Sequence, residues 1–297
     1  MKLFSFVKVG ILATVAMFIV TGCGGGGDGG SGGGSAATAK LAKATYDNAK
    51  KVEEAIFSSA VSSHTYRARV TQDSKQKANP FVLNLAKEFI KLNQDSTKRQ
   101  RVVSEACSSG SLDVSVINET ATSKTYLYSY NNCNDGAKVI NGAVELTLGS
   151  KSGNIYYTQS IIFKNGYSVR YNNGANLSIA DGGRIDITIT SYNSSNDYTF
   201  VLDTTMKITQ NGYSYGYEGM ELHYIVSGNN TYWYQTAGVI YINNYKDYVL
   251  WDSSYDMFNT PFKVDANGYP INGEARYKMD GGILRIIAEN GVITLDI

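Results

Sequence analysis

Closely spaced Asn-Gly pairs between alternating segments restrict most strongly what this chain can fold into. Seven such pairs lie between Asn141 and Gly291, in a chain of 297 residues with three prolines. Asn-Gly suits two-residue hairpin turns, which need positive φ at both positions. Apolar and polar residues alternate between the pairs, as from Ile185 to Ile189, which is the period of a strand with one buried face. Because proline cannot donate to a central ladder, the pattern predicts an antiparallel meander of long strands.

The predicted β-domain covers residues 106–297. Of the 23 tyrosines, 21 lie between Tyr126 and Tyr277, mixed with Val, Ile and Thr, a composition typical of half-buried pleated surfaces. Periodicity does not distinguish a curved open sheet, a half-barrel, a barrel or a sandwich. With helices expected before the β-domain, the fold class is mainly β with N-terminal helices (α+β).

Residues 36–105 follow a helical period and form the predicted helical segment. One helix is expected to carry on a single face Leu41, Thr45, Ala49, Val52, Ile56 and Ala60. A second is expected to begin with Asn79 as N-cap and Pro80 at the first helical position. Its apolar face would carry Phe81, Leu85, Phe89 and Leu92.

The two predicted regions carry opposite charge. Residues 36–105 hold 13 Lys and Arg against 7 Asp and Glu, a net charge of +6, whereas residues 106–297 hold 12 against 18, a net charge of −6. The basic segment either faces anionic headgroups or cell-wall polymer, or complements the acidic domain of the same molecule. The formal net charge of +1 gives no reason to expect a nucleic-acid partner.

The first 22 residues have the layout of a secretory signal peptide. Lys2 and Lys8 precede the apolar run from Val9 to Val20, which is shorter than the about 20 residues of a membrane-spanning helix. Residues 23–35 continue as CGGGGDGGSGGGS, a composition that predicts a flexible tether after the cysteine.

Val20-Thr21-Gly22-Cys23 resembles the lipobox of bacterial lipoproteins. The resemblance implies cleavage before Cys23, lipid on its thiol and acylation of its new amino group, so that the membrane is a partner through this lipid. In that family an aspartate after the cysteine often marks retention in the inner membrane. Gly24 stands at that position, which implies an outer-membrane location.

Cys107 and Cys133 remain after Cys23 is assigned to lipid. In an oxidising envelope compartment the pair predicts a disulfide, which would contribute about 3.5 kcal/mol in the chain-entropy model. Metal binding is the competing interpretation, but no histidine lies nearby to complete a ligand set. The segment from Cys107 to Gly142 is also similar to envelope lipoproteins of unknown role that have a cysteine pair at the start of a β-meander.

Catalytic motifs are scarce. Gly212-Tyr213-Ser214-Tyr215-Gly216 satisfies G-x-S-x-G, but it begins at an Asn-Gly turn instead of a strand-to-helix elbow. His64 and His223 are the only histidines, and no phosphate-binding or dinucleotide-binding fingerprint is present. We therefore expect no cofactor and no metal. A carboxylate pair stays open, because the separation it needs is spatial.

Four aromatic residues are the candidate ligand site: Tyr232, Trp233, Tyr234 and Trp251. They could form a platform for sugar rings, or they could pack in the core. The leading hypothesis is a non-enzymatic, lipid-anchored envelope protein that binds or scaffolds an envelope glycan, a lipid or another envelope protein. The alternatives are a carrier of lipid in a curved-sheet groove and a glycan hydrolase with an unrecognised carboxylate pair.

Overall fold

The computed structural model describes residues 39–57, 81–82, 85–86, 107–152, 155–194, 197–254, 260–265, 270–290 and 292–297. Residues 37–297 belong to one compact unit. The predicted signal peptide, the lipobox with Cys23 and the tether lie outside the described residues. Within the described part, no helix is both long enough and apolar enough to cross a bilayer.

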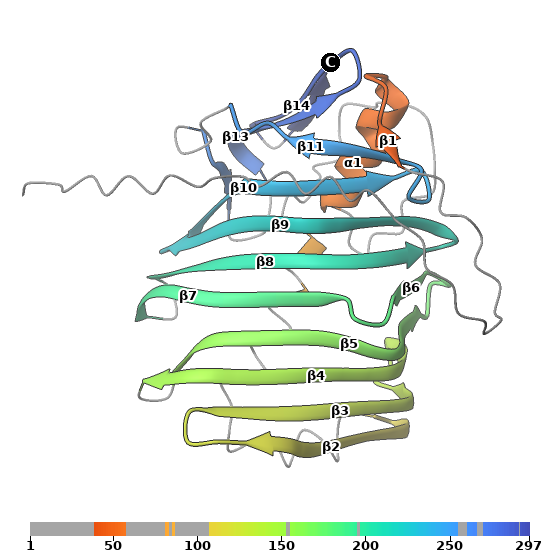
Figure 1. Ribbon diagram of the computed structural model, residues 1–297, viewed down its shortest axis with the longest axis vertical. Coiled ribbons are helices and arrows are strands. Elements are labelled where there is room, and N and C mark those ends of the chain that lie inside the picture. The colour runs from red at the N-terminus through yellow and green to blue at the C-terminus, as the bar shows by residue number, and fades with distance from the viewer. Residues whose placement is uncertain are drawn as a thin grey trace, which may run out of the picture. The chain divides into compact units, whose positions relative to one another are not determined.

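The compact unit is mainly β, as predicted, and its 15 described strands form one sheet (Figure 1). Long antiparallel neighbours make up most of it. These are β2 (Ser109–Glu119), β3 (Ser123–Asn134), β4 (Lys138–Ser152), β5 (Ile155–Tyr171), β8 (Asp197–Gln210), β9 (Tyr213–Ser227) and β10 (Asn230–Ile242).

Shorter strands complete the sheet. β6 (Asn176–Ile179) and β7 (Arg184–Ser194) share the place between β5 and β8, and β11 (Asp247–Trp251) and β12 (Phe262–Val264) share the place beside β10. β13 (Pro270–Met279), β14 (Gly282–Glu289) and β15 (Val292–Asp296) follow, and β1 (Lys40–Leu41) pairs parallel with β11. β2 and β15 each pair with one described strand, so the described sheet is open.

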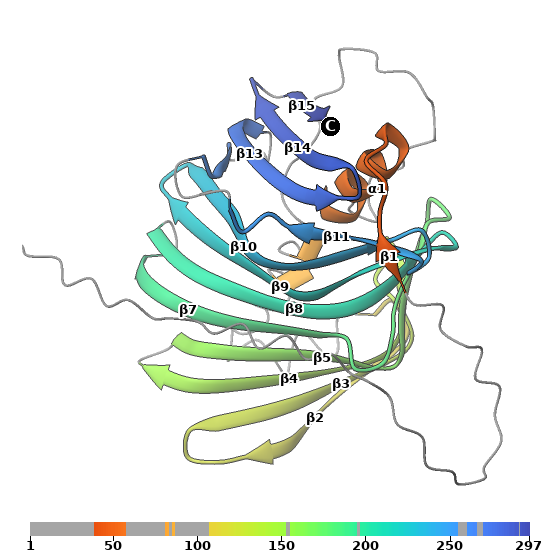
Figure 2. The ribbon, with the colours of Figure 1, turned by 45° about the horizontal axis from the view of Figure 1, so that its top comes forward.

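The sheet has an inner face, which carries the core, and an outer face. Val144, Phe163 and Leu202 point to the inner face and are 0% exposed. Asp186 and Asp203 alternate with such residues and point to the outer face. The strands bow in Figure 2, which gives the sheet its curve. The two-residue period thus gives most of the strands a buried side and a solvent-facing side.

The first predicted helix is present but begins later than the helical pattern. α1 spans Tyr46–Phe57, and Ala49, Val52 and Ile56 are buried as expected. The helical prediction is wrong at Leu41, which lies in β1 beside β11. The Thr45 hydroxyl accepts a hydrogen bond from the Asn48 backbone N–H at 3.3 Å, so Thr45 caps the helix where the pattern had placed it inside.

α1 packs on the inner face through its C-terminal end. The Phe57 ring lies edge-on to Trp233 at 5.8 Å and also contacts Phe262. The Tyr217 hydroxyl donates to the Ala55 carbonyl, one of the last-turn carbonyls that a helix cannot pair internally. The helix is therefore part of the core of the β-unit.

Of the second predicted helix, two apolar positions can be assessed. Phe81 and Leu85 are helical and buried, at 5% and 7% exposure. Ala60, Asn79, Pro80, Phe89 and Leu92 lie outside the described residues.

The Asn-Gly pairs that the structure describes divide into turns and strand irregularities, whereas Asn267-Gly268 and Gly291 lie outside the described residues. Asn211-Gly212 forms the hairpin turn between β8 and β9, with φ of 50° and 81°. The turn prediction is wrong for Asn141-Gly142 and Asn165-Gly166, which lie inside β4 and β5. Positive φ also suits a β-bulge, and these two pairs face each other where the β4–β5 register shifts. Asn272-Gly273 likewise lies inside β13.

Irregularities on neighbouring strands line up across the sheet, and we call this line the bend. It includes the register shifts at Tyr130/Cys133, Asn141/Ala143, Thr204/Met206 and Gln235/Val239, and the gap between β6 and β7 at Ala180–Gly183. Figure 1 shows the chain stepping aside between β6 and β7. Bulges increase the local twist of a strand. The long strands that cross the bend therefore change direction there.

The predicted disulfide between Cys107 and Cys133 is confirmed. The two Cα atoms lie 5.1 Å apart, within the usual range for a disulfide. Cys133 is 2% exposed and lies at the bend in β3, so the bond ties Cys107, two residues before β2, to the bend.

Candidate functional site

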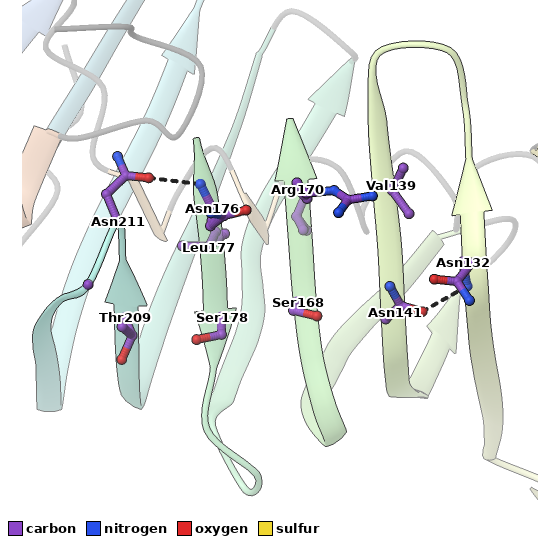
Figure 3. A pocket seen from close by; sticks show the side chains of 12 residues that line it. Asn132, Val139, Asn141, Ser168, Arg170, Asn176, Leu177, Ser178, Thr209 and Asn211 are labelled. Carbon is purple, nitrogen blue, oxygen red and sulfur yellow. Dashed lines mark hydrogen bonds between the residues drawn. The ribbon is translucent and has the colours of Figure 1, made fainter. Parts of the chain in front are cut away.

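A polar pocket lies on the outer face, on the side of the bend that contains β6 and the turn between β8 and β9. Its volume is about 380 Å³, and β3, β4, β5, β6 and β8 supply its walls (Figure 3). The side chains that matter here are Asn141, Ser168, Arg170, Ser178, Thr209 and Asn211. No Asp or Glu is among the described residues that line the pocket, so these residues present amides, hydroxyls and a single formal charge.

Four of these side chains form a row across the strands. Asn141 pairs with Ser168, Ser168 with Ser178, and Ser178 with Thr209. Directly paired residues point to the same face of a sheet, and Figure 3 shows the four side chains side by side. Three strand spacings make the row about 14 Å long.

Two asparagine side chains hold the pocket walls together, because their oxygens accept hydrogen bonds from backbone N–H groups in place of backbone carbonyls. Asn141 Oδ1 accepts from the Asn132 N–H at 2.8 Å, and Asn211 Oδ1 accepts from the Asn176 N–H at 2.8 Å. Because a backbone N–H can only donate, these contacts determine which amide atom is oxygen. The NH₂ groups of Asn141 and Asn211 are therefore held in place as donors.

Arg170 provides the positive charge. It is exposed on β5, and its side chain extends along the pocket wall toward Val139 in Figure 3. Within the described part of the chain, its guanidinium has neither an ion pair nor a hydrogen-bond partner. A guanidinium offers a fixed fork of donors that matches carboxylate and phosphate groups, so Arg170 is available to an anion.

A tyrosine cluster on the outer face contacts Lys207, which lies two residues before the pocket residue Thr209 on β8. Tyr241 stacks on Tyr245 at 5.4 Å, and the Lys207 ammonium lies 5.0 Å from the Tyr245 ring centre. Burial, together with the Glu218 carboxylate that accepts from the Tyr241 hydroxyl at 2.6 Å, raises the pKa of Tyr241 to about 12. These rings contact each other and Lys207, but none of them is among the described residues that line the pocket.

The four aromatic candidates lie elsewhere. Trp233 is 1% exposed and stacks on Phe262 at 4.4 Å, and Trp251 is 7% exposed and lies edge-on to Tyr277. Their burial favours core packing for both tryptophans. On the outer face, Tyr234 stacks on His223 at 4.7 Å, and the Lys263 ammonium lies over the ring of half-buried Tyr232.

A row of carboxylates crosses the outer face on the other side of the bend. Asp186, Asp203 and Glu221 stand directly opposite one another on β7, β8 and β9. Burial, Asp186 and Glu221 raise the pKa of Asp203. Burial alone would raise the pKa of Glu221, but hydrogen bonds from Thr236 and His223 outweigh it and lower that pKa.

Two carboxylates with pKa values moved apart can share acid and base roles. The pKa of Asp203 is raised and that of Glu221 is lowered, so these two residues are the candidates for the carboxylate pair that the sequence left open. None of the three acids lines the pocket, and in the described residues no three His, Cys, Asp or Glu side chains are arranged to hold a metal ion.

Within the described residues, Ser214 does not contact a histidine. Its hydroxyl lies 2.8 Å from the Thr209 hydroxyl, whereas His223 contacts Glu221 at 2.9 Å. The G-x-S-x-G segment is the start of β9 after a hairpin turn, as the sequence context indicated.

Sequence reasoning missed the pocket. Its residues come from five strands and the turn between β8 and β9, and they form no motif along the chain. One signal was present in the sequence: Asn141, Ser168 and Thr209 lie in or near Asn-Gly pairs. Only the pairing register of the strands shows that these residues lie side by side. Comparison with protein-family models, curated proteins and solved structures finds no match to this chain.

Proposed function

We propose that the protein is a lipid-anchored protein of the bacterial cell envelope with a non-enzymatic binding role at the outer membrane. Cys23 carries the anchor, and residues 24–35 separate the β-unit from the membrane. The observation that carries the proposal is the disulfide between Cys107 and Cys133. Such bonds persist in oxidising compartments and are rare in the cytosol, which agrees with export directed by the signal peptide.

The character of the outer face supports binding over catalysis. The pocket at the bend combines amides and hydroxyls with Arg170, a set that can orient a ligand but holds no general base of its own. The carboxylate row is separate from this pocket. A scaffold of long strands tied by a disulfide also suits a surface that stays preorganised for a partner.

Substitution of the lipobox cysteine tests the anchor. We expect Cys23→Ser to abolish lipid attachment, because serine lacks the thiol that accepts the lipid, and to move the full-length protein from the membrane to the soluble fraction. Intact-mass spectrometry and cell fractionation measure the two effects. Ser31→Ala, in the same tether, should change neither.

Persistence of Cys23→Ser in the membrane fraction, or the absence of a lipid mass on the unsubstituted protein, would contradict the proposal. The same soluble preparation separates binding from lipid transport, because its own anchor no longer contributes lipid. Stoichiometric co-purified lipid would support a lipid carrier.

A further inference from the structure

We propose that the pocket at the bend binds an anionic glycan, that is, a chain of hydroxylated sugars bearing carboxylate or phosphate groups. This inference rests on the proposed binding role and names its ligand class. It is carried by the juxtaposition of Arg170 with the row of hydroxyl and amide side chains on the same face.

The row matches the hydroxyl groups of sugars. Within the described residues, the side chains of Ser168 and Ser178 have no hydrogen-bond partner, and each hydroxyl can both donate and accept. The NH₂ groups of Asn141 and Asn211 add donors whose orientation is set by contacts to backbone N–H groups at 2.8 Å. A surface that alternates such groups suits a ligand with many hydroxyls and little apolar area.

Arg170 selects for negative charge. Its guanidinium can bind a carboxylate or a phosphate through two parallel hydrogen bonds. No Asp or Glu lies among the lining residues that the structure describes, so none of them compensates this charge. Lys207, two residues before Thr209 on β8 and on the same face, adds a second positive charge at the margin.

The dimensions indicate an oligosaccharide. A volume of about 380 Å³ lies in the range of small-molecule sites, and the row extends about 14 Å across the strands. Because Arg170 lies on β5 and Thr209 on β8, a ligand that reaches both spans three strands. The hydrogen bonds from Asn132 and Asn176 to the asparagine side chains hold this geometry before the ligand arrives.

Calorimetric titration of the purified full-length protein tests the inference. The probes are trigalacturonic acid, which carries carboxylates, a phosphomannan, which carries phosphates, and neutral maltotriose. We expect one or both anionic probes to bind and maltotriose to bind at least about tenfold more weakly, because a hydrogen bond to a charged group contributes on this scale. Which anionic probe binds identifies the source of the charge.

Arg170→Gln should weaken binding of the anionic probe by about tenfold or more. Arg170→Lys should restore part of it, because lysine keeps the charge but loses the fork. The matched control is Arg184→Gln, which removes an exposed guanidinium from the outer face on the other side of the bend. It should change affinity less than about twofold, since exposed charges more than a Debye length away are screened.

The inference is overturned by equal effects of Arg170→Gln and Arg184→Gln, by equal affinity for maltotriose, or by failure of both anionic probes to bind. Ser178→Ala, which leaves every charge in place, should also weaken binding. An unchanged affinity in this variant would count against recognition by the hydroxyl row. None of these results bears on the fractionation of Cys23→Ser, so failure of the pocket and failure of the anchor are read separately.

Discussion

The inner and outer faces of the sheet are made by alternate residues of the same strands, yet they differ in how much each position is constrained. On the inner face Val144, Phe163 and Trp233 are at most 1% exposed. On the outer face charged, polar and aromatic side chains such as Asp186, Ser168 and Tyr232 lie partly in solvent, and the pocket opens where the bend redirects the strands. Burial of apolar side chains on the inner face stabilises the fold. The outer face carries less of that constraint and is available for binding.

The largest effect is expected on the inner face, from loss of the indole that joins α1 to the sheet. Trp233→Ala removes the ring that stacks on Phe262 and contacts Phe57, and should lower the free energy of unfolding by about 3–5 kcal/mol. Chemical denaturation measures the change. Tyr232→Ala, the neighbouring half-buried outer-face residue, should cost much less. Similar losses for both variants would remove the distinction between the faces.

A smaller effect is expected at the bend itself. A Cβ at Gly142 would lie 2.5 Å from Tyr167 Cα and the residue has φ of +93°, so Gly142→Ala should cost about 2 kcal/mol or more. Gly212→Ala, at the hairpin turn with φ of +81° and no atom within 4 Å, should cost about 1 kcal/mol. The two thermal or chemical unfolding curves give the difference. If Gly142→Ala cost no more than Gly212→Ala, close strand approach would not shape the bend.

The smallest effect is expected for an outer-face ion cluster. Arg276 and Arg285 stand opposite each other on β13 and β14, and Glu274 contacts each at 2.7 Å. Glu274→Gln should lower stability by about 1 kcal/mol at neutral pH, because the two guanidinium groups lose their shared counter-ion. Glu289→Gln, at an exposed position of β14, is the matched control and should have no comparable effect.

The same pair of variants gives a pH dependence. Burial would raise the pKa of Glu274, but hydrogen bonds and charge from Arg285 and Arg276 lower it below its usual value. The stabilisation is therefore present above the unfolded-state pKa of about 4.3 and is lost as the pH falls through the lower folded-state pKa. The stability difference between the unsubstituted protein and Glu274→Gln should shrink over this range. A difference independent of pH would show that the carboxylate charge is not responsible.

Much of the β-unit could be predicted because strand faces are encoded locally. Ile185 and Ile187 point inward and Asp186 outward, as their alternation indicates, and the disulfide could be inferred from cysteine number and compartment. Leu41 shows where a local pattern fails. It has a helical spacing to Thr45 and Ala49, but pairing with Tyr248 in β11 places it in a strand.

The sequence by itself determined the alternation that gives the sheet a dry and a wet face, the turn at Asn211-Gly212 and the pairing of Cys107 with Cys133. The tertiary structure decided that Asn141-Gly142 would be a bulge and that Asn141, Ser168, Ser178 and Thr209 would share one surface. The physical reason is that side-chain period depends on a few neighbouring bonds, whereas register depends on how strands far apart in the chain pair and twist together. The candidate site exists only at that second level.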